Sequence, residues 1–166
     1  IYGMSAFGLA KDLGISQADA QEFIDKYFSR YPKVKNFMDN AIRQCEEKGF
    51  VTTLLNRRRY IPGINSPNES MKQFAQRQAI NTPVQGSAAD LMKLAMIDIH
   101  REIKKRELAS QILITVHDEL VLDVPNKEKD EIVELLRERM EHPLELSVPI
   151  KVSVKTGANW LETKEA

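Results

Sequence analysis

Apolar residues recur every three or four positions along much of the chain, which is the spacing of amphipathic helices. Residues 16–31 begin with Ser16 and carry Asp19 three positions later, a capping signal placed just before such a stripe. Pro32 suits the first position of a following helix, and Gly49 is a usual residue just beyond a helix C-terminus. The pattern therefore predicts two successive helices, the second ending before Gly49.

A long helix is predicted to begin at Ser66 as its cap, with Pro67 at its first position, and to end near Arg106. Pro83 and Gly86 interrupt this segment, so we expect a kink there. Beyond the kink, one apolar stripe is expected to face the core: Ala88, Leu91, Ala95, Ile99 and Ile103.

Shorter apolar runs predict strands and one more helix. Residues 50–62 indicate two short strands around a turn at Asn56 and Arg57, because Asn tolerates the left-handed backbone that such turns require. Residues 125–142 form an amphipathic helical pattern, and residues 148–157 alternate as a last strand. Helices interspersed with a small antiparallel sheet make the expected fold class α+β.

The segment ITVHDELVLDV places ionisable residues between two apolar runs. The strands expected at 111–116 and 119–124 are almost continuously apolar, which predicts burial on both faces. His117 and Asp118 form a two-residue connection and Glu119 follows it, so a tight hairpin would carry two adjacent carboxylates at its tip. Two such charges repel each other unless a cation lies between them, and Mg²⁺ binds few but well-fixed carboxylates. This tip is a candidate metal site.

Two other interpretations of this tip stay open at this point. Asp is a common turn residue, so a polar hairpin tip needs no function. An H-D pair also occurs in metal phosphohydrolases, where further His and Asp ligands join it. The other histidines, His100 and His142, show no second pair at ligand spacing.

Polar residues also recur at helical spacing within the long helix. Arg77, Asn81 and Gln85 are four positions apart, so they share a face if the helix persists through them. Side chains of these types can meet minor-groove acceptors, which occur at similar positions in all base pairs. The segment NRRRY at 56–60 adds a plausible phosphate clamp. A solvated polar face and ordinary surface arginines are the alternatives.

Composition narrows the class of protein. The 166 residues suit one domain or a large piece of one, and 24 Lys and Arg balance 24 Asp and Glu, so no net charge draws the chain to nucleic acid or membrane. The only cysteine, Cys45, excludes a disulfide framework, indicates a reducing intracellular compartment and is interpreted as a structural thiol. No apolar run is long enough for a membrane span. The opening IYGMSAFGLA lacks an initiator Met, so we expect a fragment of a larger protein.

Several stretches together resemble one family. IYGMSAFGLA, TLLNRRRYIPGINSPN, QRQAINTPVQGSAADLMKLAMI, TVHDELVLDVP and TGANWLETKE are similar, in order and spacing, to the C-terminal polymerase region of bacterial DNA polymerase I, the family A DNA polymerases. The resemblance covers essentially all of the chain. It implies a palm fragment with an H-D-E hairpin, in which residues of about 1–50 are fingers-derived helices and about 51–166 are palm.

The resemblance implies template-directed addition of dNMP to a primer 3′-hydroxyl in replication and repair, with two Mg²⁺ ions. The aspartate of the family's motif falls on Asp118, a metal ligand, and Glu119 is the acid next to the metals or the primer end. His117 would lie near the primer strand. Tyr2 matches the fingers tyrosine beside the nascent base pair, where the dNTP binds.

The resemblance also implies the DNA contacts of the polar row. Arg77 and Gln85 match residues that touch the minor groove of the primer–template duplex, and Asn81 lies between them. The chain departs from the pattern of many relatives at three positions, none of them the metal ligand: Thr115 for Gln, Gln76 for Glu and Asn56 for Gly.

The family's first metal-binding aspartate and its triphosphate-binding Arg and Lys would lie upstream of this chain. We therefore expect the isolated chain to be inactive, to need the missing N-terminal part as a partner, and to occur in the cytoplasm with the nucleoid. The alternative is a non-catalytic module that binds duplex nucleic acid on the same scaffold.

Overall fold

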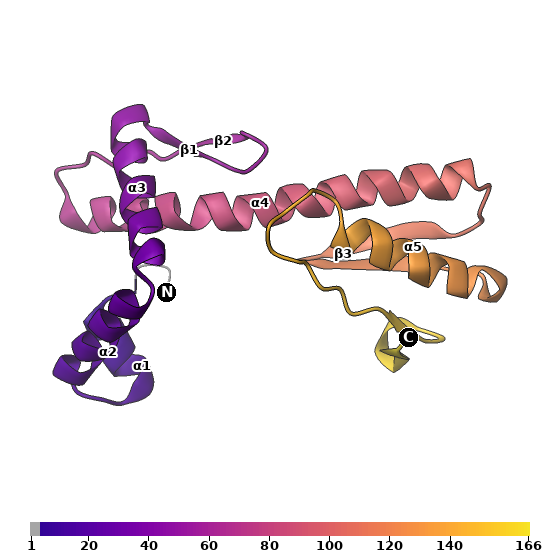
Figure 1. The fold of residues 1–166 in the computed structure, drawn as a ribbon, viewed down its shortest axis with the longest axis horizontal. Coiled ribbons are helices and arrows are strands. Elements are labelled where there is room, and N and C mark those ends of the chain that lie inside the picture. The colour runs from indigo at the N-terminus through magenta and orange to yellow at the C-terminus, as the bar shows by residue number, and fades with distance from the viewer. Residues whose placement is uncertain (1–3) are drawn as a thin grey trace. The chain divides into compact units, whose positions relative to one another are not determined.

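The computed structural model describes residues 4–166. The chain divides into two compact units, with the boundary between Ser87 and Ala88. The first unit holds three helices, one two-stranded sheet and the start of a long helix (Figure 1). Its elements are α1 (Ala6–Leu13), α2 (Gln17–Arg30), α3 (Pro32–Lys48), β1 (Phe50–Thr52) and β2 (Arg58–Tyr60). The long helix, α4 (Glu69–Lys105), continues into the second unit. No helix within residues 4–166 combines the length and apolar character needed to cross a bilayer.

Local chemistry sets the ends of the first helices as predicted. The Ser16 hydroxyl accepts a hydrogen bond from the Asp19 backbone N–H at 3.1 Å and donates one to the Asp19 carboxylate at 2.7 Å. Pro32 opens α3, and Gly49 ends it in the left-handed conformation with a φ of 75°. The predicted turn at Asn56 is also confirmed, with a φ of 60° between β1 and β2.

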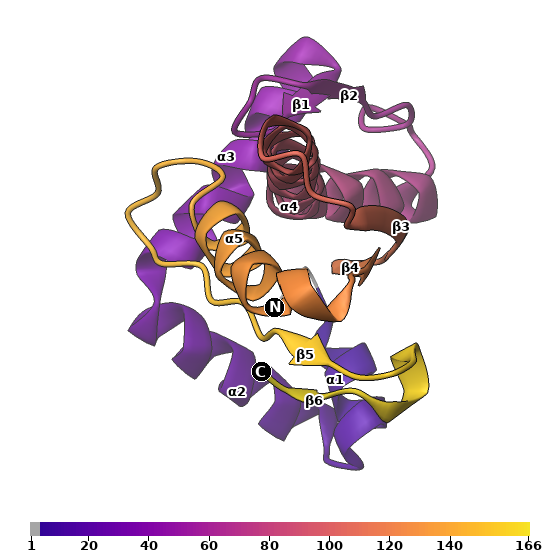
Figure 2. The same ribbon diagram turned by 90° about the vertical axis from the view of Figure 1, so that its right-hand side faces the viewer.

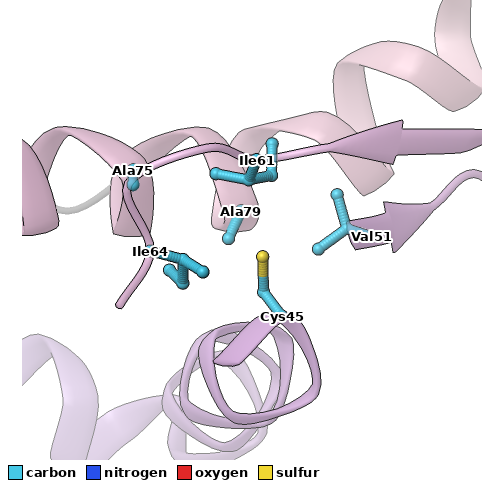
Figure 3. Close-up of a cluster of buried hydrophobic side chains, with 6 residues drawn as sticks. All are labelled: Cys45, Val51, Ile61, Ile64, Ala75 and Ala79. Atoms are coloured by element: carbon cyan, nitrogen blue, oxygen red, sulfur yellow. The ribbon is translucent and has the colours of Figure 1, made fainter. Parts of the chain in front are cut away.

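The core of the first unit is small and contains the only cysteine. Figure 3 shows the Cys45 side chain of α3 directed at α4, with β1 and the segment after β2 closing the sides. This cluster consists of Cys45, Val51, Ile61, Ile64, Ala75 and Ala79. Burial raises the pKa of the Cys45 thiol, which keeps it neutral. Cys45 is therefore a packing residue, as the sequence indicated.

The start of α4 differs from the prediction. The helix begins at Glu69, and the Asn68 side chain accepts a hydrogen bond from the Met71 backbone N–H at 3.1 Å, so Asn68 caps it. The Ser66 hydroxyl instead accepts from the Asn68 backbone N–H at 3.2 Å within the preceding turn. The predicted cap at Ser66 was wrong because two residues able to cap a helix, Ser66 and Asn68, lie two positions apart. Asn68, the second of them, caps α4. The helix then continues through Pro83 without ending.

The second unit packs a hairpin and a helix against the C-terminal half of α4. Its elements are β3 (Gln111–Val116), β4 (Glu119–Asp123), η1 (Asn126–Glu128), α5 (Lys129–Glu141), β5 (Lys155–Thr156), η2 (Trp160–Glu162) and β6 (Lys164–Glu165). The buried cluster joins α4 to α5 through Ala95, Ile99, Ile103, Ile132 and Leu135. Figure 2 shows β3, β4 and α5 beside α4. Ile112, Leu120 and Leu122 of the hairpin pack onto this cluster.

Three predictions for this unit need correction. The two hairpin strands are not buried on both faces, because the cluster covers only one; Leu113 is 62% exposed and Ile114 46%. In the core-facing stripe, Ala88 is exposed and Leu91 half-buried, so the stripe starts at Ala95.

The strand expected at 148–157 is mostly absent. Only Lys155–Thr156 pairs, with Lys164–Glu165, and an apolar alternation without a backbone partner forms no ladder.

Candidate functional site

The β3–β4 hairpin carries the ionisable tip. Val116 pairs with Glu119, which leaves His117 and Asp118 as the two connecting residues. His117 has a φ of 54°, so a non-glycine residue takes the left-handed conformation that this turn requires. Further down, the register shifts between Ile112 and Ile114, which leaves an extra residue in β3. The tip is therefore a short, sharply defined turn.

The carboxylates at this tip are open to ligands. The side chains of Asp118 and Glu119 are both exposed, and neither carboxylate makes a hydrogen bond or ion pair within the described part of the chain. Residues 4–166 contain no group of three or more His, Cys, Asp or Glu side chains that could enclose a metal. Mg²⁺ commonly keeps several waters and takes one or two protein carboxylates together with substrate phosphates. The tip fits that partial role, and a fuller set of protein ligands would need residues from elsewhere.

A buried carboxylate fixes the other end of β3. Glu128, only 7% exposed, accepts hydrogen bonds from the Ser110 hydroxyl at 2.7 Å and from the Ser110 and Ala109 backbone N–H groups at 3.0 and 3.2 Å. These hydrogen bonds, the Ser110 hydroxyl above all, lower the pKa of Glu128 below its ordinary value. Sequence reasoning missed this residue, because nothing in its local spacing indicates a partner 18 positions away.

The polar row lies along one face of α4, as expected if the helix persists. Arg77 and Gln85 are exposed and Asn81 is half-buried. The Arg77 guanidinium lies 6.0 Å from the centre of the Phe74 ring. The Asn81 amide oxygen is buried, and no donor among the described residues reaches it. A buried acceptor without a donor is uncommon in proteins, and an ordered water or a bound ligand is the usual way to satisfy it.

The β1–β2 hairpin is fastened to α4 beside this row by two hydroxyls. The Thr82 hydroxyl donates to the Gln78 carbonyl at 2.7 Å and accepts from Arg59 Nη1 at 3.1 Å. The Ser87 hydroxyl donates to the Pro83 carbonyl and accepts from the Leu54 backbone N–H at 2.9 Å.

These contacts place the part of α4 around Pro83 and Gly86, two residue types that disfavour helix, against the β1–β2 hairpin. Gly86 allows the close approach, since a Cβ there would lie 2.7 Å from Thr53 Cγ2. The sequence signal for this contact was the pair of hydroxyl residues near Pro83, Thr82 and Ser87. Such residues in a helix often donate a hydrogen bond to the carbonyl four residues earlier.

Charge is unevenly distributed in a chain with no net charge. Residues 48–89 carry six Lys and Arg residues and one acidic residue. Residues 90–166 carry twelve Lys and Arg residues against sixteen acidic residues. The segment with the polar row and the arginine hairpin is thus basic, which suits phosphate groups, and the segment with the carboxylate tip is acidic, which suits cations.

The structure groups the predicted site residues into two sets. Arg77, Asn81 and Gln85 lie on α4 in the first unit, and His117, Asp118 and Glu119 form the tip in the second. Tyr2 lies outside the described residues.

Comparison with known proteins identifies the family of the chain. The family model for DNA polymerase family A matches residues 1–162. DNA polymerase I of Caldicellulosiruptor bescii is 50% identical over 164 residues, which are 99% of this chain and 19% of that protein. DNA polymerase I of Bacillus subtilis is 44% identical over the same shares. The chain thus spans about a fifth of the length of these curated relatives.

A solved structure shares the fold. The POL domain of Pol1 from M. smegmatis, in a complex with DNA primer-template and dNTP, matches with a TM-score of 0.87 and 41% sequence identity. The match covers 90% of this chain and 26% of that chain. Because the family model matches nearly the whole chain, the chain belongs to DNA polymerase family A.

Proposed function

We propose that the chain is the part of a DNA-directed DNA polymerase that holds the primer end and one side of the metal site. The observation that carries this proposal is the exposed, unpaired Asp118–Glu119 tip on a packed hairpin, in a chain that matches the polymerase family along its length. In this assignment the first helices, to about residue 50, derive from the fingers, and the remainder is palm.

The tip's own residues would act through position and charge. Asp118 would hold Mg²⁺ at the primer end, with Glu119 beside it and His117 against the primer strand. Two Mg²⁺ ions, when bound, would supply stabilisation of negative charge on the attacking and leaving oxygens. Ile112, Leu120 and Leu122 pack the hairpin onto the buried cluster, which would fix the backbone that carries Asp118. Fixed placement is a large part of the rate in such transfers.

The polar row on α4 would bind the primer–template duplex. Arg77 and Gln85 donate hydrogen bonds, and the Asn81 amide can both donate and accept. Minor-groove acceptors are common to all base pairs, so such contacts grip a duplex of any sequence. The excess of Lys and Arg in residues 48–89 would add sequence-independent attraction to phosphates.

The isolated chain is expected to be inactive, because the carboxylates of one exposed tip would not hold two metal ions in register by themselves. The test is a chimera in which this chain replaces the matching segment of the Caldicellulosiruptor bescii DNA polymerase I. We expect the chimera to extend a primer with Mg²⁺, and Asp118→Asn to slow extension on the order of 1000-fold while duplex binding stays within a few-fold.

A non-catalytic duplex-binding module is the second candidate, favoured by the basic segment alone. It predicts that the isolated chain binds duplex DNA equally well with Asp118 or Asn at the tip, and that the chimera fails to extend. Primer extension by the purified 166-residue chain would contradict the proposed division of labour. An active chimera that is unaffected by Asp118→Asn would contradict the assigned role of the tip.

A further inference from the structure

The β1–β2 hairpin has two chemically different faces. Strand pairing places Phe50 opposite Tyr60, Val51 opposite Arg59 and Thr52 opposite Arg58. Side chains alternate across a strand, so Val51 and Arg59 share the inner face, where one is in the buried cluster and the other bonds to Thr82. Phe50, Arg58 and Tyr60 therefore share the outer face.

The outer face is an ordered stack of one cation and two aromatic rings. The Arg58 guanidinium lies 5.0 Å from the centre of the Phe50 ring. The Phe50 and Tyr60 rings meet edge to face, with centres 5.6 Å apart and planes at 63°. Tyr60 is nonetheless 67% exposed, so most of the residue is open to solvent. Such an arrangement holds the side chains in place before any ligand arrives.

The hairpin also has the charge that an anionic polymer needs. Between Glu47 and Glu69 the sequence contains no acidic residue, while Arg57, Arg58 and Arg59 follow one another. The inner face is fastened to α4 through the Thr82 and Ser87 hydroxyls, so the outer face is mounted on a rigid helix. An exposed aromatic ring next to arginine, on a firmly held hairpin without acidic residues, is the composition of a single-strand binding surface.

We propose that the outer face of the β1–β2 hairpin binds an unpaired stretch of nucleic acid, with Tyr60 stacking on a base and Arg58 contacting a phosphate. A base in a duplex has both faces covered by its neighbours, so an exposed ring selects an unpaired nucleotide over a paired one. The polar row on α4, by contrast, carries hydrogen-bonding side chains that suit the base edges in the groove of a duplex. That the bound strand is the template ahead of the primer end rests on the proposed function.

The test compares two DNA molecules that differ only in an unpaired extension. One is a blunt duplex, and the other is the same duplex with a 5′ template extension of about six nucleotides, within the site size of single-strand binding surfaces. Equilibrium binding is measured for the 166-residue chain and repeated in the polymerase chimera, so the test does not depend on how firmly the chain alone holds DNA. Thermal unfolding of each variant confirms that it is folded.

Tyr60→Ala is expected to weaken binding of the extended DNA by about 5- to 100-fold and to leave the blunt duplex unchanged, because it removes one stacked base. Tyr60→Phe keeps the ring and should bind like the unaltered protein. Arg58→Ala should lower the slope of log affinity against log salt by about 0.7 for the extended DNA, the value for one phosphate contact with a single strand. Phe23→Ala is the matched control, since Phe23 is 60% exposed in the same unit but lies outside the basic segment.

Equal weakening of both DNA molecules by Tyr60→Ala, or no weakening of either, would overturn this proposal. If the chimera extends primers while Tyr60→Ala changes nothing, the hairpin assignment fails and the proposed polymerase function stands. If neither the chain nor the chimera binds DNA, the hairpin proposal and the proposed polymerase function are both contradicted.

Discussion

The two larger hairpins of this chain are both antiparallel, but different kinds of contact support them. The β1–β2 hairpin is fastened to α4 by hydrogen bonds from Arg59 and the Leu54 backbone, across a close approach at Gly86. The β3–β4 hairpin rests on apolar contacts with the α4–α5 cluster and is anchored at its base by Glu128. One carries arginines in a basic segment and the other carries carboxylates in an acidic one.

Because of this difference, we expect the two hairpins to respond differently to mutations of the residues that support them. Hydrogen bonds to hydroxyls fix a position and a direction, but each contributes only about 1 kcal/mol net. Apolar burial contributes more and is less directional. We therefore expect core truncation under β3–β4 to cost stability, and small changes under β1–β2 to displace the arginine face.

The largest expected effect is that of Leu135→Ala. Leu135 is 1% exposed in the cluster below β3–β4, and such truncations cost about 2–5 kcal/mol. Leu113→Ala is the matched control, because Leu113 is 62% exposed on β3 and should change the free energy of unfolding by less than about 0.5 kcal/mol. Urea denaturation of the chain measures both. Equal losses would mean that the cluster is not what supports this hairpin.

A smaller loss is expected from Gly86→Ala. The added Cβ would contact Thr53 Cγ2, and such overpacking costs about 1–3 kcal/mol, which exceeds the helix propensity gain of about 1 kcal/mol. Gly8→Ala in α1 is the control, since its Cβ would lie 3.4 Å from the nearest atom, Met4 Cγ, and should stabilise the chain slightly. Adding Thr53→Ser removes the contacting methyl and should restore stability to Gly86→Ala. Failure of that rescue would show that the close approach is not the cause.

Sequence reasoning succeeded for the hairpins where the signals are local. The strands at 111–116 and 119–124 were placed to within one residue, because turn chemistry and apolar runs lie within a few positions. The caps at Ser16 and Gly49 followed for the same reason. The residue types at the Asp118–Glu119 tip are equally local, although their role stays a prediction.

The rest depends on contacts that no local pattern encodes. Which face of β3 is covered follows from where α4 and α5 pack, and an extra residue near Leu113 shifts the alternation. The Ser110 and Glu128 contact joins residues 18 positions apart. Likewise, the alternation over 148–157 could not reveal that most of this segment lacks a pairing strand.

The anchor at the base of β3–β4 should make stability depend on pH. The pKa of Glu128 is lowered from its ordinary value of 4.5, so the folded state favours the charged carboxylate. Its contribution is therefore complete above pH 4.5 and is lost as the pH falls through the lower folded pKa. Denaturation curves from pH 7 to pH 3 should show this loss in the unaltered chain, and Glu128→Gln should reduce it.

A matched carboxyl on the exposed side of α5 separates this anchor from general acid effects. Glu134→Gln removes one charge without touching the Ser110 contact, so its pH profile should follow that of the unaltered chain. Should both variants flatten the profile equally, the pH dependence would reflect overall charge and not this anchor.

The smallest expected effects concern the two left-handed tip residues. His117 and Asn56 have φ values of 54° and 60°, a conformation that costs most L-residues about 1–2 kcal/mol but costs Asn less. Glycine removes that strain and adds about 0.5–1 kcal/mol of unfolded-state entropy. We therefore expect His117→Gly to stabilise the chain by up to about 1 kcal/mol, and Asn56→Gly to leave stability almost unchanged.

The same two substitutions, His117→Gly and Asn56→Gly, test whether the left-handed conformation of either residue is needed for function. Residues in sparsely populated conformations persist at sites where the side chain is needed. His117→Gly in the polymerase chimera should therefore slow primer extension although it stabilises the fold, whereas Asn56→Gly should extend as before. If His117→Gly lowers stability, the turn depends on contacts of the imidazole. If it raises stability without slowing extension, the histidine is not needed at the primer end, and the tip acts through Asp118 and Glu119 alone.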